Sequence, residues 1–287
     1  MMLRKKYIRE IFSREISKSK GNYEMNKNEY LVSIITPTFN SVKYIEDTIK
    51  SVITQTYSSW EMNIVDDCST DDTREIVNKW CKKDSRIRLS KLDQNQGASA
   101  ARNMSLSQAS GRFIAYLDAD DIWSPQKLEK QVDFMITNNY GFSCTSYEVI
   151  EDTGKSLNKE IYMLPQVDYM GFLTNNLLQT VGIMVDTNIV NKKNLVMPSM
   201  RRRQDAATWL QILKDGHKCY GMREILAQYR RAENSLSSNK VKAVKGIWFL
   251  YRNVEHLSLP ISIYCFVRYA FFAVGKRMYT KNPKRRS

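Results

Sequence analysis

The first half of the chain alternates between two hydrophobic periods. Short runs rich in β-branched residues predict buried strands, and between them apolar residues recur three and four positions apart, as in amphipathic helices. The predicted strands are residues 31–36, 61–65, 88–92 and 113–117, and the predicted helices are 44–55, a second from about 71, 97–110 and 125–138. Such alternation predicts a parallel sheet with right-handed crossovers.

From residue 141 onwards the pattern is less regular. Strand-like runs occupy residues 141–147, 180–185 and 220–230, and helical patterns occupy 168–175 and 204–214. We therefore expect an α/β fold with one mixed, mainly parallel sheet flanked by helices. The predicted organisation is a basic N-terminal arm over residues 1–29, one domain over 30–238, and a helical C-terminal extension over 239–287.

Polar residues follow three of the predicted strands where each strand ends. Thr38, Phe39 and Asn40 follow the first strand, Asp66-Asp67 ends the second, and Asp118-Ala119-Asp120-Asp121 ends the fourth. Ligands of open parallel sheets bind beyond the carboxyl ends of the strands. Carboxylates one residue apart suit a hard divalent cation that carries substrate phosphates, although Asp-x-Asp is also common in surface turns.

Five motifs carry a resemblance to a known family. They are V-S-I-I-T-P-T-F-N at 32–40, V-D-D-C-S-T-D at 65–71, N-Q-G-A-S-A-A-R-N at 95–103, L-D-A-D-D at 117–121 and R-Q-D-A-A-T-W-L at 203–210. With them the sequence resembles glycosyltransferase family 2, which has the GT-A fold, over about residues 30–235. Gln204-Asp205 before Trp209-Leu210, together with residues 234–240, resembles bacterial enzymes of capsule, O-antigen and teichuronic-acid assembly.

The resemblance implies roles for the acidic residues. Asp120 would bind a divalent metal, Mn²⁺ or Mg²⁺, and Asp118 would contact the ribose or the surroundings of the ion, while Asp121 could assist through water. Asp205 would be the general base of an inverting transfer, where geometry matters before pKa. Its structural alternative is a helix N-cap.

Five further residues are predicted to bind the nucleotide-sugar. Asp67 would accept a hydrogen bond from the imide N–H of uracil, Phe39 would offer a flat face to the base, and Pro37 could contribute only backbone contacts. Gly97 allows close backbone approach at a helix N-terminus that favours anions. The resemblance directs Arg102 towards the nucleotide. The structural alternatives are core packing for Phe39 and a surface salt bridge for Arg102.

One position departs from the family pattern. Many relatives carry His where Ala232 stands, and that His approaches the metal or the diphosphate. Its absence leaves this contact unassigned, and Arg230 or Arg231 could neutralise the diphosphate instead.

The net charge of the chain limits the classes of binding partner that we expect. The formal net charge is +14, with basic residues concentrated at both ends, which suits nucleic acid, anionic lipid or phosphorylated substrates. No nucleic-acid-binding motif accompanies the charge. The five cysteines form no Cys-x-x-Cys pair, so we expect free thiols in a reducing compartment. Two histidines exclude a His-rich metal site, and the N-terminus lacks a signal-peptide pattern. We expect a cytoplasmic protein.

An apolar stretch over residues 259–274 contains Arg268 and is followed by basic residues. It is short for a membrane span. An interfacial helix on the inner membrane face suits this pattern, and a helix docked on the core is the alternative. A lipid-linked acceptor would give membrane contact a purpose.

The sequence therefore predicts inverting, metal-dependent transfer of a sugar from a UDP-sugar to a hydroxyl of a lipid-linked glycan in cell-surface polysaccharide assembly. A nucleotidyltransferase acting on sugar phosphates is one alternative, but it would usually need a glycine-rich phosphate loop after the first strand. A non-catalytic nucleotide-sugar-binding protein is another, but it would not need Asp120 and Asp205 together.

Overall fold

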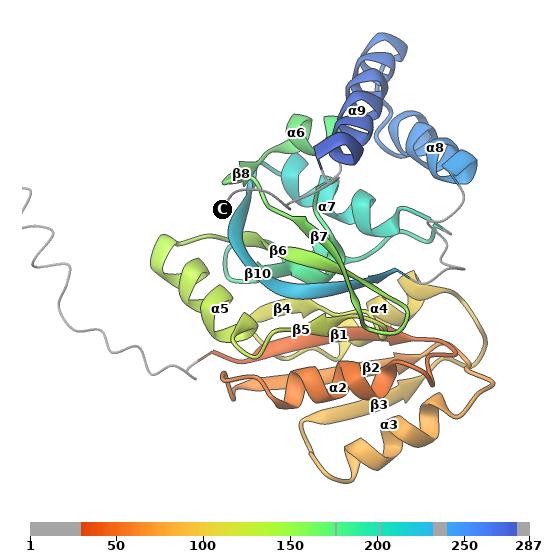
Figure 1. The fold of residues 1–287 in the computed structure, drawn as a ribbon, viewed down its shortest axis with the longest axis vertical. Coiled ribbons are helices and arrows are strands. Elements are labelled where there is room, and N and C mark those ends of the chain that lie inside the picture. The colour runs from red at the N-terminus through yellow and green to blue at the C-terminus, as the bar shows by residue number, and fades with distance from the viewer. Residues whose placement is uncertain (1–29, 176, 201, 232–239, 280–287) are drawn as a thin grey trace, which may run out of the picture.

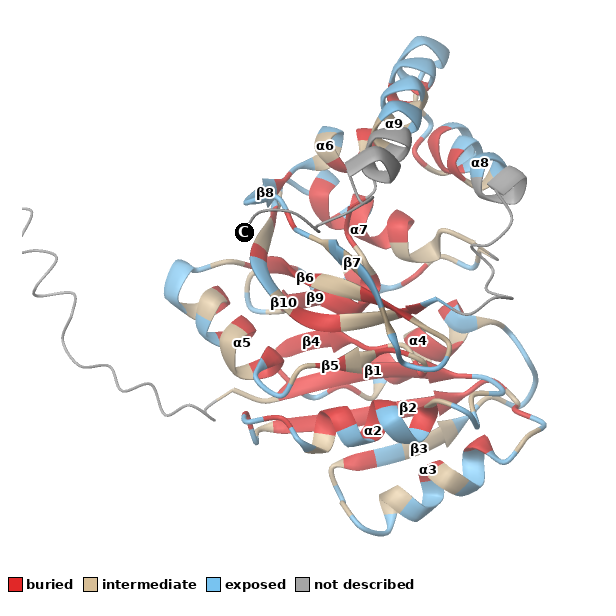
Figure 2. Ribbon diagram, viewed as in Figure 1, coloured by how far each residue is buried: buried red, intermediate tan, exposed pale blue. Residues whose placement is uncertain are grey.

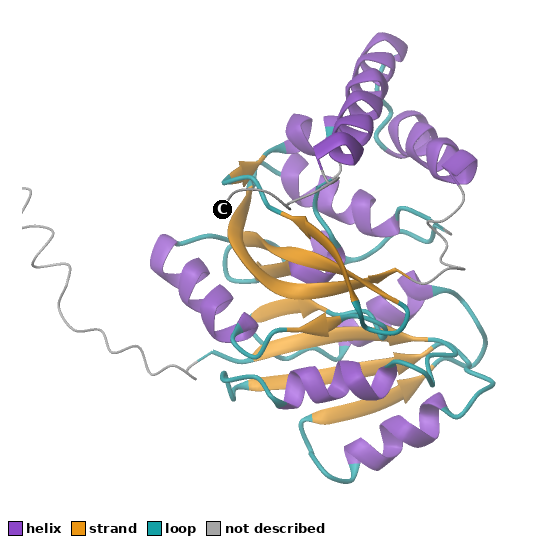
Figure 3. Cartoon of the chain, viewed as in Figure 1, coloured by secondary structure: helices purple, strands orange, loops and turns teal. Residues whose placement is uncertain are grey.

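A mixed sheet of ten strands runs through the computed structural model, which describes residues 30–175, 177–200, 202–231 and 240–279 (Figure 1). The main strand order is β3-β2-β1-β4-β9-β6-β10-β5, with β7 paired to β6 and β8 to β10. Helices cover both faces of the sheet (Figure 3). The predicted basic arm of residues 1–29 lies outside the described residues.

The first half follows the predicted alternation of strands and helices. β1 (Val32–Thr38) pairs in parallel with β2 (Trp60–Asp66) and β4 (Phe113–Tyr116), and β2 pairs in parallel with β3 (Ile87–Lys91). The helices are α2 (Ile45–Ile53), α3 (Thr73–Cys81), α4 (Ala98–Ser107) and α5 (Lys127–Asn138). The predicted parallel sheet is confirmed here.

The second half is mostly antiparallel. β9 (Ile183–Asp186) pairs antiparallel with β4 and with β6 (Phe142–Glu151), while β10 (Cys219–Arg231) runs parallel to β6. The short strands β5 (Ile122–Trp123), β7 (Ser156–Ile161) and β8 (Gln166–Val167) were not predicted. The helices are α6 (Tyr169–Thr174), α7 (Gln204–Lys214) and the 3₁₀ segment η2 (Lys192–Leu195).

The predicted strand over residues 180–185 is wrong in its first half. Thr180–Gly182 forms the 3₁₀ turn η1, and the strand begins only at Ile183. A Cβ atom on Gly182 would lie 2.7 Å from the carbonyl oxygen of Thr145, so the backbone of β6 passes directly against this turn. The close approach is a tertiary contact that the local sequence pattern does not reveal.

Two apolar layers hold the helices on the sheet, and the strands between them are buried (Figure 2). Neighbouring residues of β1 face opposite sides: Ile34 belongs to the apolar cluster that includes residues of α2, α3 and α5, and Ile35 to the cluster that includes residues of α4 and α7. Strands buried on both faces read as continuous apolar runs, which is why the first-half strands were predictable.

The C-terminal helices complete the second layer. α8 (Lys240–Phe249) continues into the π-helical turn η3 (Leu250–Val254), and α9 (Leu259–Tyr279) contacts α6 and η3. Ile247, Leu250, Tyr251 and Cys265 belong to the same apolar cluster as α7. Within the described ranges, no helix combines the length and apolarity needed to cross a membrane.

Candidate functional site

The predicted meeting of strand ends at one sheet edge is present. Thr38 at the end of β1 lies in register with Asp66 at the end of β2, and Ile35 is paired with Tyr116 at the end of β4. Asp118 and Asp120 follow β4 directly. The parallel register therefore places the three polar segments side by side, although they are separated by about 30 to 50 residues in sequence.

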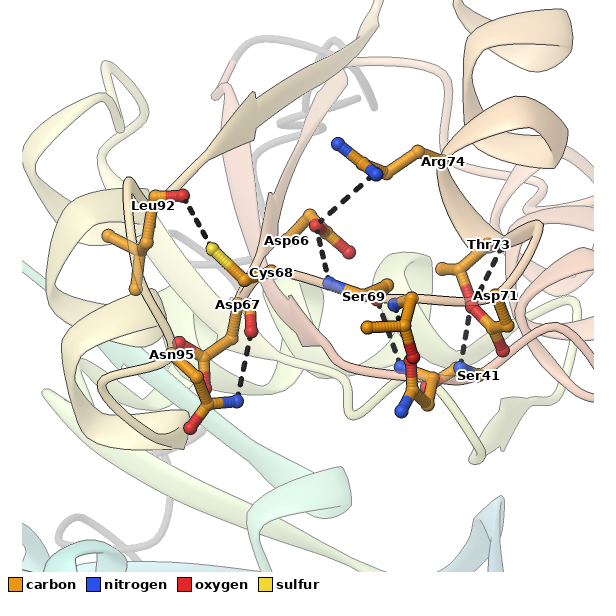
Figure 4. A network of polar contacts seen from close by, with 12 residues as sticks. Ser41, Asp66, Asp67, Cys68, Ser69, Asp71, Thr73, Arg74, Leu92 and Asn95 are labelled. Atoms are coloured by element: carbon orange, nitrogen blue, oxygen red, sulfur yellow. Dashed lines mark hydrogen bonds and ion pairs between the residues drawn. The ribbon is translucent and has the colours of Figure 1, made fainter.

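Hydrogen bonds tie the loop after β1 to the loop after β2 (Figure 4). The backbone amide of Asn40 donates to Ser69 Oγ over 2.9 Å, and Asn40 Oδ1 accepts from the amide of Thr70 over 2.8 Å. The Asp66 carboxylate accepts from the amide of Ser69 over 3.0 Å, and the guanidinium of Arg74 lies 3.8 Å away. Asp66 thus holds the loop after β2 through the amide of Ser69.

Asp67 holds the loop before α4. Its two carboxylate oxygens accept hydrogen bonds from the backbone amides of Gln96, over 2.7 Å, and Gly97, over 2.8 Å (Figure 4 shows the neighbouring Asn95 contact). The side-chain amide of Asn95 donates to the Asp67 carbonyl oxygen over 3.0 Å. A carboxylate has about four lone-pair sites, so a further donor such as uracil would share these oxygens.

The other predicted nucleotide residues differ in exposure. Phe39 is 47% exposed, so the core-packing alternative is wrong. Pro37 lies inside β1, paired with Val65 and buried, which leaves only its backbone near a ligand. Gly97 precedes the first residue of α4 with φ of +88°, a conformation that residues other than glycine rarely adopt.

The buried Arg102 forms an ion pair with the partly exposed Asp118. The guanidinium NH2 of Arg102 lies 2.5 Å from Asp118 Oδ1, and NH1 lies 3.9 Å from the sulfur of Met197. Burial alone would lower the pKa of Arg102, but the Asp118 carboxylate outweighs it and raises that pKa. Because Arg102 is only 6% exposed, the surface salt-bridge alternative is wrong. Arg102 instead orients one of the two Asp-x-Asp carboxylates.

The surroundings of Asp120 disfavour the charged form of its carboxylate. Burial, and then the negative charge of Asp118, raise the pKa of Asp120 to about 6, while Arg230 and Arg102 partly offset the rise. A carboxylate disfavoured in this way is stabilised when a cation arrives.

A divalent cation fits this turn only if the substrate completes its coordination. Among the described residues, no cluster of three or more His, Cys, Asp or Glu side chains is arranged to hold a metal ion. Mg²⁺ commonly binds one or two carboxylates together with substrate phosphates and water. Asp120, with Asp118 beside it, suits such an open site.

Asp121 is buried, and its hydrogen bonds are made within the protein. Its carboxylate accepts a hydrogen bond from the backbone amide of Arg230 over 2.8 Å, and its carbonyl oxygen accepts from Thr48 Oγ1 over 2.9 Å. Burial, and the neighbouring Asp120 and Asp118, raise the pKa of Asp121. The residue anchors the turn to β10 and α2.

Arg230 fastens the same turn. Its Nε donates to the carbonyl oxygen of Asp120 over 2.8 Å, its NH1 donates to that of Asp152 over 2.9 Å, and its guanidinium lies 4.9 Å from the ring centroid of Tyr44. The Asp152 carboxylate in turn accepts from Tyr44 and Lys43. Arg230 is 3% exposed. Its guanidinium, which was predicted to contact the diphosphate, is instead bonded to the backbone of Asp120 and Asp152.

Arg231 lies exposed at the end of β10. Ala232 and most of the motif at 234–240 fall in residues 232–239, outside the described residues. Sequence reasoning missed Asp152 and Tyr44, because neither stands in a recognisable motif and their partners come from distant segments.

Asp205 is the second residue of α7. The residue before the helix is Arg203, which has φ of +65° and makes no side-chain cap, so the N-cap alternative for Asp205 is wrong. Thr180 Oγ1 donates to Asp205 Oδ2 over 3.4 Å. The Asp205 carboxylate is also near enough to Arg102 to contribute to its raised pKa. The charges of both Asp118 and Asp205 therefore act on Arg102.

Comparison with known proteins identifies relatives along almost the whole chain. The family model described as "Glycosyl transferase family 2" matches residues 33–197. The putative teichuronic acid biosynthesis glycosyltransferase TuaG of Bacillus subtilis is 46% identical over 86% of this chain and 98% of its own length. The Escherichia coli UDP-Glc:alpha-D-GlcNAc-diphosphoundecaprenol beta-1,3-glucosyltransferase WfgD is 35% identical over 90% of this chain and 100% of its own.

Two solved structures share the architecture. TarS 1–349 of S. aureus, in complex with UDP-GlcNAc, superposes with a TM-score of 0.65 at 21% identity, over 83% of this chain and 71% of TarS. The mannosyltransferase PcManGT of Pyrobaculum calidifontis, in complex with GDP-Man and Mn²⁺, gives a TM-score of 0.63 at 15% identity, over 95% of this chain and 83% of that protein. The predicted GT-A fold, with its C-terminal helices, is confirmed.

Proposed function

This chain belongs to glycosyl transferase family 2, and we propose that it transfers a sugar from a UDP-sugar with inversion of the anomeric carbon. The proposed acceptor is a hydroxyl of a lipid-linked glycan, and the proposed process is the assembly of a cell-surface polysaccharide.

One observation carries the proposal. Arg102 pairs with Asp118 of the Asp-x-Asp turn and lies within electrostatic reach of Asp205, so the donor-binding turn and the base belong to one site. Family membership also sets aside the nucleotidyltransferase and non-catalytic alternatives.

The donor follows from the nucleotide side of this site. The backbone amide of Asp67 donates to the carbonyl oxygen of Thr38 over 2.8 Å, so Asp67 lies close in the fold to the exposed Phe39, and the N-terminus of α4 suits an anion. WfgD is named for UDP-Glc, and TarS was solved with UDP-GlcNAc. A UDP-sugar therefore matches both the residues and the relatives.

A divalent cation at Asp120, Mn²⁺ or Mg²⁺, would neutralise the negative charge that grows on the departing diphosphate. Burial and the charge of Asp118 raise the pKa of Asp120, and a bound cation would favour the charged form of this carboxylate. PcManGT was solved with Mn²⁺. The chain's own contribution is a rigid turn, held by Thr48 from α2 and by Arg230 from β10.

Asp205 acts as the general base. It takes the proton of the acceptor hydroxyl as that oxygen attacks the anomeric carbon and the bond to the diphosphate breaks. This single displacement inverts the anomeric configuration. Thr180 fixes the orientation of the carboxylate by donating to Oδ2.

The acceptor is proposed from chemistry and from relatives. WfgD is named for a substrate on diphosphoundecaprenol, and TuaG for teichuronic acid biosynthesis. A lipid-linked acceptor would require this enzyme to work at the inner face of the membrane, as a peripheral protein.

The test is a panel of nucleotide-sugars assayed for nucleotide release, with Mn²⁺, with Mg²⁺ and with a chelator. We expect release from a UDP-sugar that depends on metal and acceptor. Asp120→Asn should abolish it, whereas the matched exposed change Asp133→Asn on α5 should not. Metal-independent turnover, or wild-type turnover by Asp120→Asn, would show that the metal assignment is wrong.

A further inference from the structure

Helix α9 packs one face against the protein. Ser262 and Cys265 are fully buried, and Phe266, Tyr269 and Phe272 are partly buried. These residues recur at three- and four-residue spacing, so they form one stripe along the helix. Cys265 belongs to the apolar cluster that includes α7. Because this stripe touches protein, the helix cannot be surrounded by lipid.

The opposite face of α9 is apolar and exposed. Ile263, Tyr264, Val267 and Phe271 are 48%, 51%, 61% and 73% exposed, and their spacing places them on the side of the helix away from the buried stripe. A surface helix in water normally turns charged and polar residues outward. A helix that is apolar on both faces therefore requires a second apolar partner.

Helix α8 extends this surface. Val244, Trp248 and Phe249 are 45%, 36% and 49% exposed. The rings of Trp248 and Phe266 meet edge to face, with centroids 5.9 Å apart, so the two helices lie together at one end of the molecule (Figure 1). We call the exposed residues of α8 and α9 the C-terminal apolar face.

The sequence that carries this face is strongly basic. Residues 240–287 contain eleven Lys and Arg and one acid, Glu255. Glu255 is buried, accepts a hydrogen bond from Tyr169 over 2.6 Å and lies 3.4 Å from the amine of Lys214. Arg268 is exposed beside Tyr264, its NH1 lying 3.1 Å from the Tyr264 hydroxyl. Two copies of so basic a segment would repel each other, whereas an anionic lipid surface would attract it.

We propose that the C-terminal apolar face is a membrane-docking surface that inserts Val267, Phe271 and Trp248 into the interfacial region of an anionic bilayer. This deepens the proposed function, since it rests on an acceptor held in the membrane. The two alternatives predicted for the C-terminal helix are then compatible: one face docks on the core, and the other faces lipid.

The helices α8 and α9 also lie close to α7, the helix that carries Asp205. A small apolar cavity is lined by Arg203 and Ala206 of the α7 region together with Ile247, Tyr251 and Tyr269 of the C-terminal helices. Docking through α8 and α9 would therefore place the N-terminal end of α7, which carries Asp205, at a fixed position relative to the lipid surface.

The test uses the full chain and vesicles of phosphatidylcholine with and without phosphatidylglycerol, at low and high salt, with no donor or acceptor present. We expect sedimentation with anionic vesicles that weakens at high salt and is much weaker with phosphatidylcholine alone. Val267→Gln/Phe271→Gln should lower vesicle affinity on the order of tenfold to a hundredfold, because two apolar side chains no longer enter the lipid. The matched change Leu157→Gln/Leu164→Gln, at exposed apolar positions elsewhere, should leave vesicle affinity unchanged.

Three outcomes would overturn the proposal: no binding to anionic vesicles at low salt, unchanged binding by Val267→Gln/Phe271→Gln, or a dimer in vesicle-free solution that this variant dissociates. An unchanged melting temperature for the variant excludes misfolding as the cause of lost binding, and a lowered one would move these side chains into the core. Because sedimentation needs no sugar transfer, binding without turnover would contradict the proposed function alone.

Discussion

The backbone amide of Arg230 donates a hydrogen bond to the carboxylate of Asp121 over 2.8 Å, across 109 residues of sequence. The same arginine binds the carbonyl oxygen of Asp120 through Nε. The C-terminal end of strand β10 thus holds the Asp-x-Asp turn, and Asp118 of that turn pairs with Arg102. Asp121 and Arg230 position the donor site.

We expect Arg230→Lys to impair catalysis although it keeps the charge. Arg230 binds the carbonyl oxygens of Asp120 and Asp152 through two separate nitrogens, whereas a lysine carries all its donors on one nitrogen, so the turn should shift. Small displacements of catalytic groups can cost about a hundredfold, and we expect a loss of kcat/KM of about ten- to a hundredfold, with a higher metal concentration needed for half-maximal activity. Steady-state kinetics with metal titration measures both. Arg223→Lys, an exposed change on the same strand, should behave as wild type; full activity of Arg230→Lys would contradict the positioning role.

Asp205→Asn should preserve the fold and donor affinity but lose transfer. An amide of the same shape cannot take the acceptor proton, and losing a general base typically costs about a hundred- to ten-thousand-fold in turnover. Calorimetry with UDP should give an affinity close to wild type. Asp215→Asn, at the exposed far end of α7, is the matched control. A large loss of UDP affinity in Asp205→Asn would assign this residue a structural role instead.

Asp67→Ala should affect both stability and donor binding. Two backbone amides, those of Gln96 and Gly97, lose their acceptor, which should lower the free energy of unfolding by about 1–3 kcal/mol. If Asp67 also contacts uracil, the donor KM should rise more than kcat falls, because that contact is made before and during the reaction. Thermal unfolding and steady-state kinetics separate the effects. A loss of stability at unchanged KM would leave Asp67 with its structural role alone.

Glu61 should make stability depend on pH in the acidic range. Burial would raise the pKa of Glu61, but hydrogen bonds from Ser110 and Ser33, and the charge of Arg88, outweigh it and lower that pKa below its ordinary 4.5. The charged form is therefore favoured in the folded state. Its stabilisation is present above pH 4.5 and is lost as the pH falls through the lowered folded value.

The corresponding variant is Glu61→Gln. At neutral pH it should lose about 1–3 kcal/mol of unfolding free energy, and the difference from wild type should shrink as the pH falls below the folded pKa. Denaturant titrations at several pH values measure this. Glu160→Gln, an exposed change on β7, should show neither effect. A difference that stays constant with pH would mean that Glu61 acts through packing.

The sequence by itself determined the first-half alternation of strands and helices and the location of Asp118, Asp120 and Asp67 at strand ends. It could do so because strands buried on both faces read as uninterrupted apolar runs, and a parallel register brings their carboxyl ends to one edge. The same local periodicity located α7, and with it Asp205.

Only the tertiary structure decided what these residues contact. Asp67 is engaged by the loop before α4, and Arg230 is directed inward to Asp120 and Asp152 rather than left open to a ligand. Likewise α9 packs one face on the core and exposes the other. Hydrogen-bond partners and packing faces come from segments far apart in the chain, and their meeting depends on the register and twist of the whole sheet, which local periodicity does not encode.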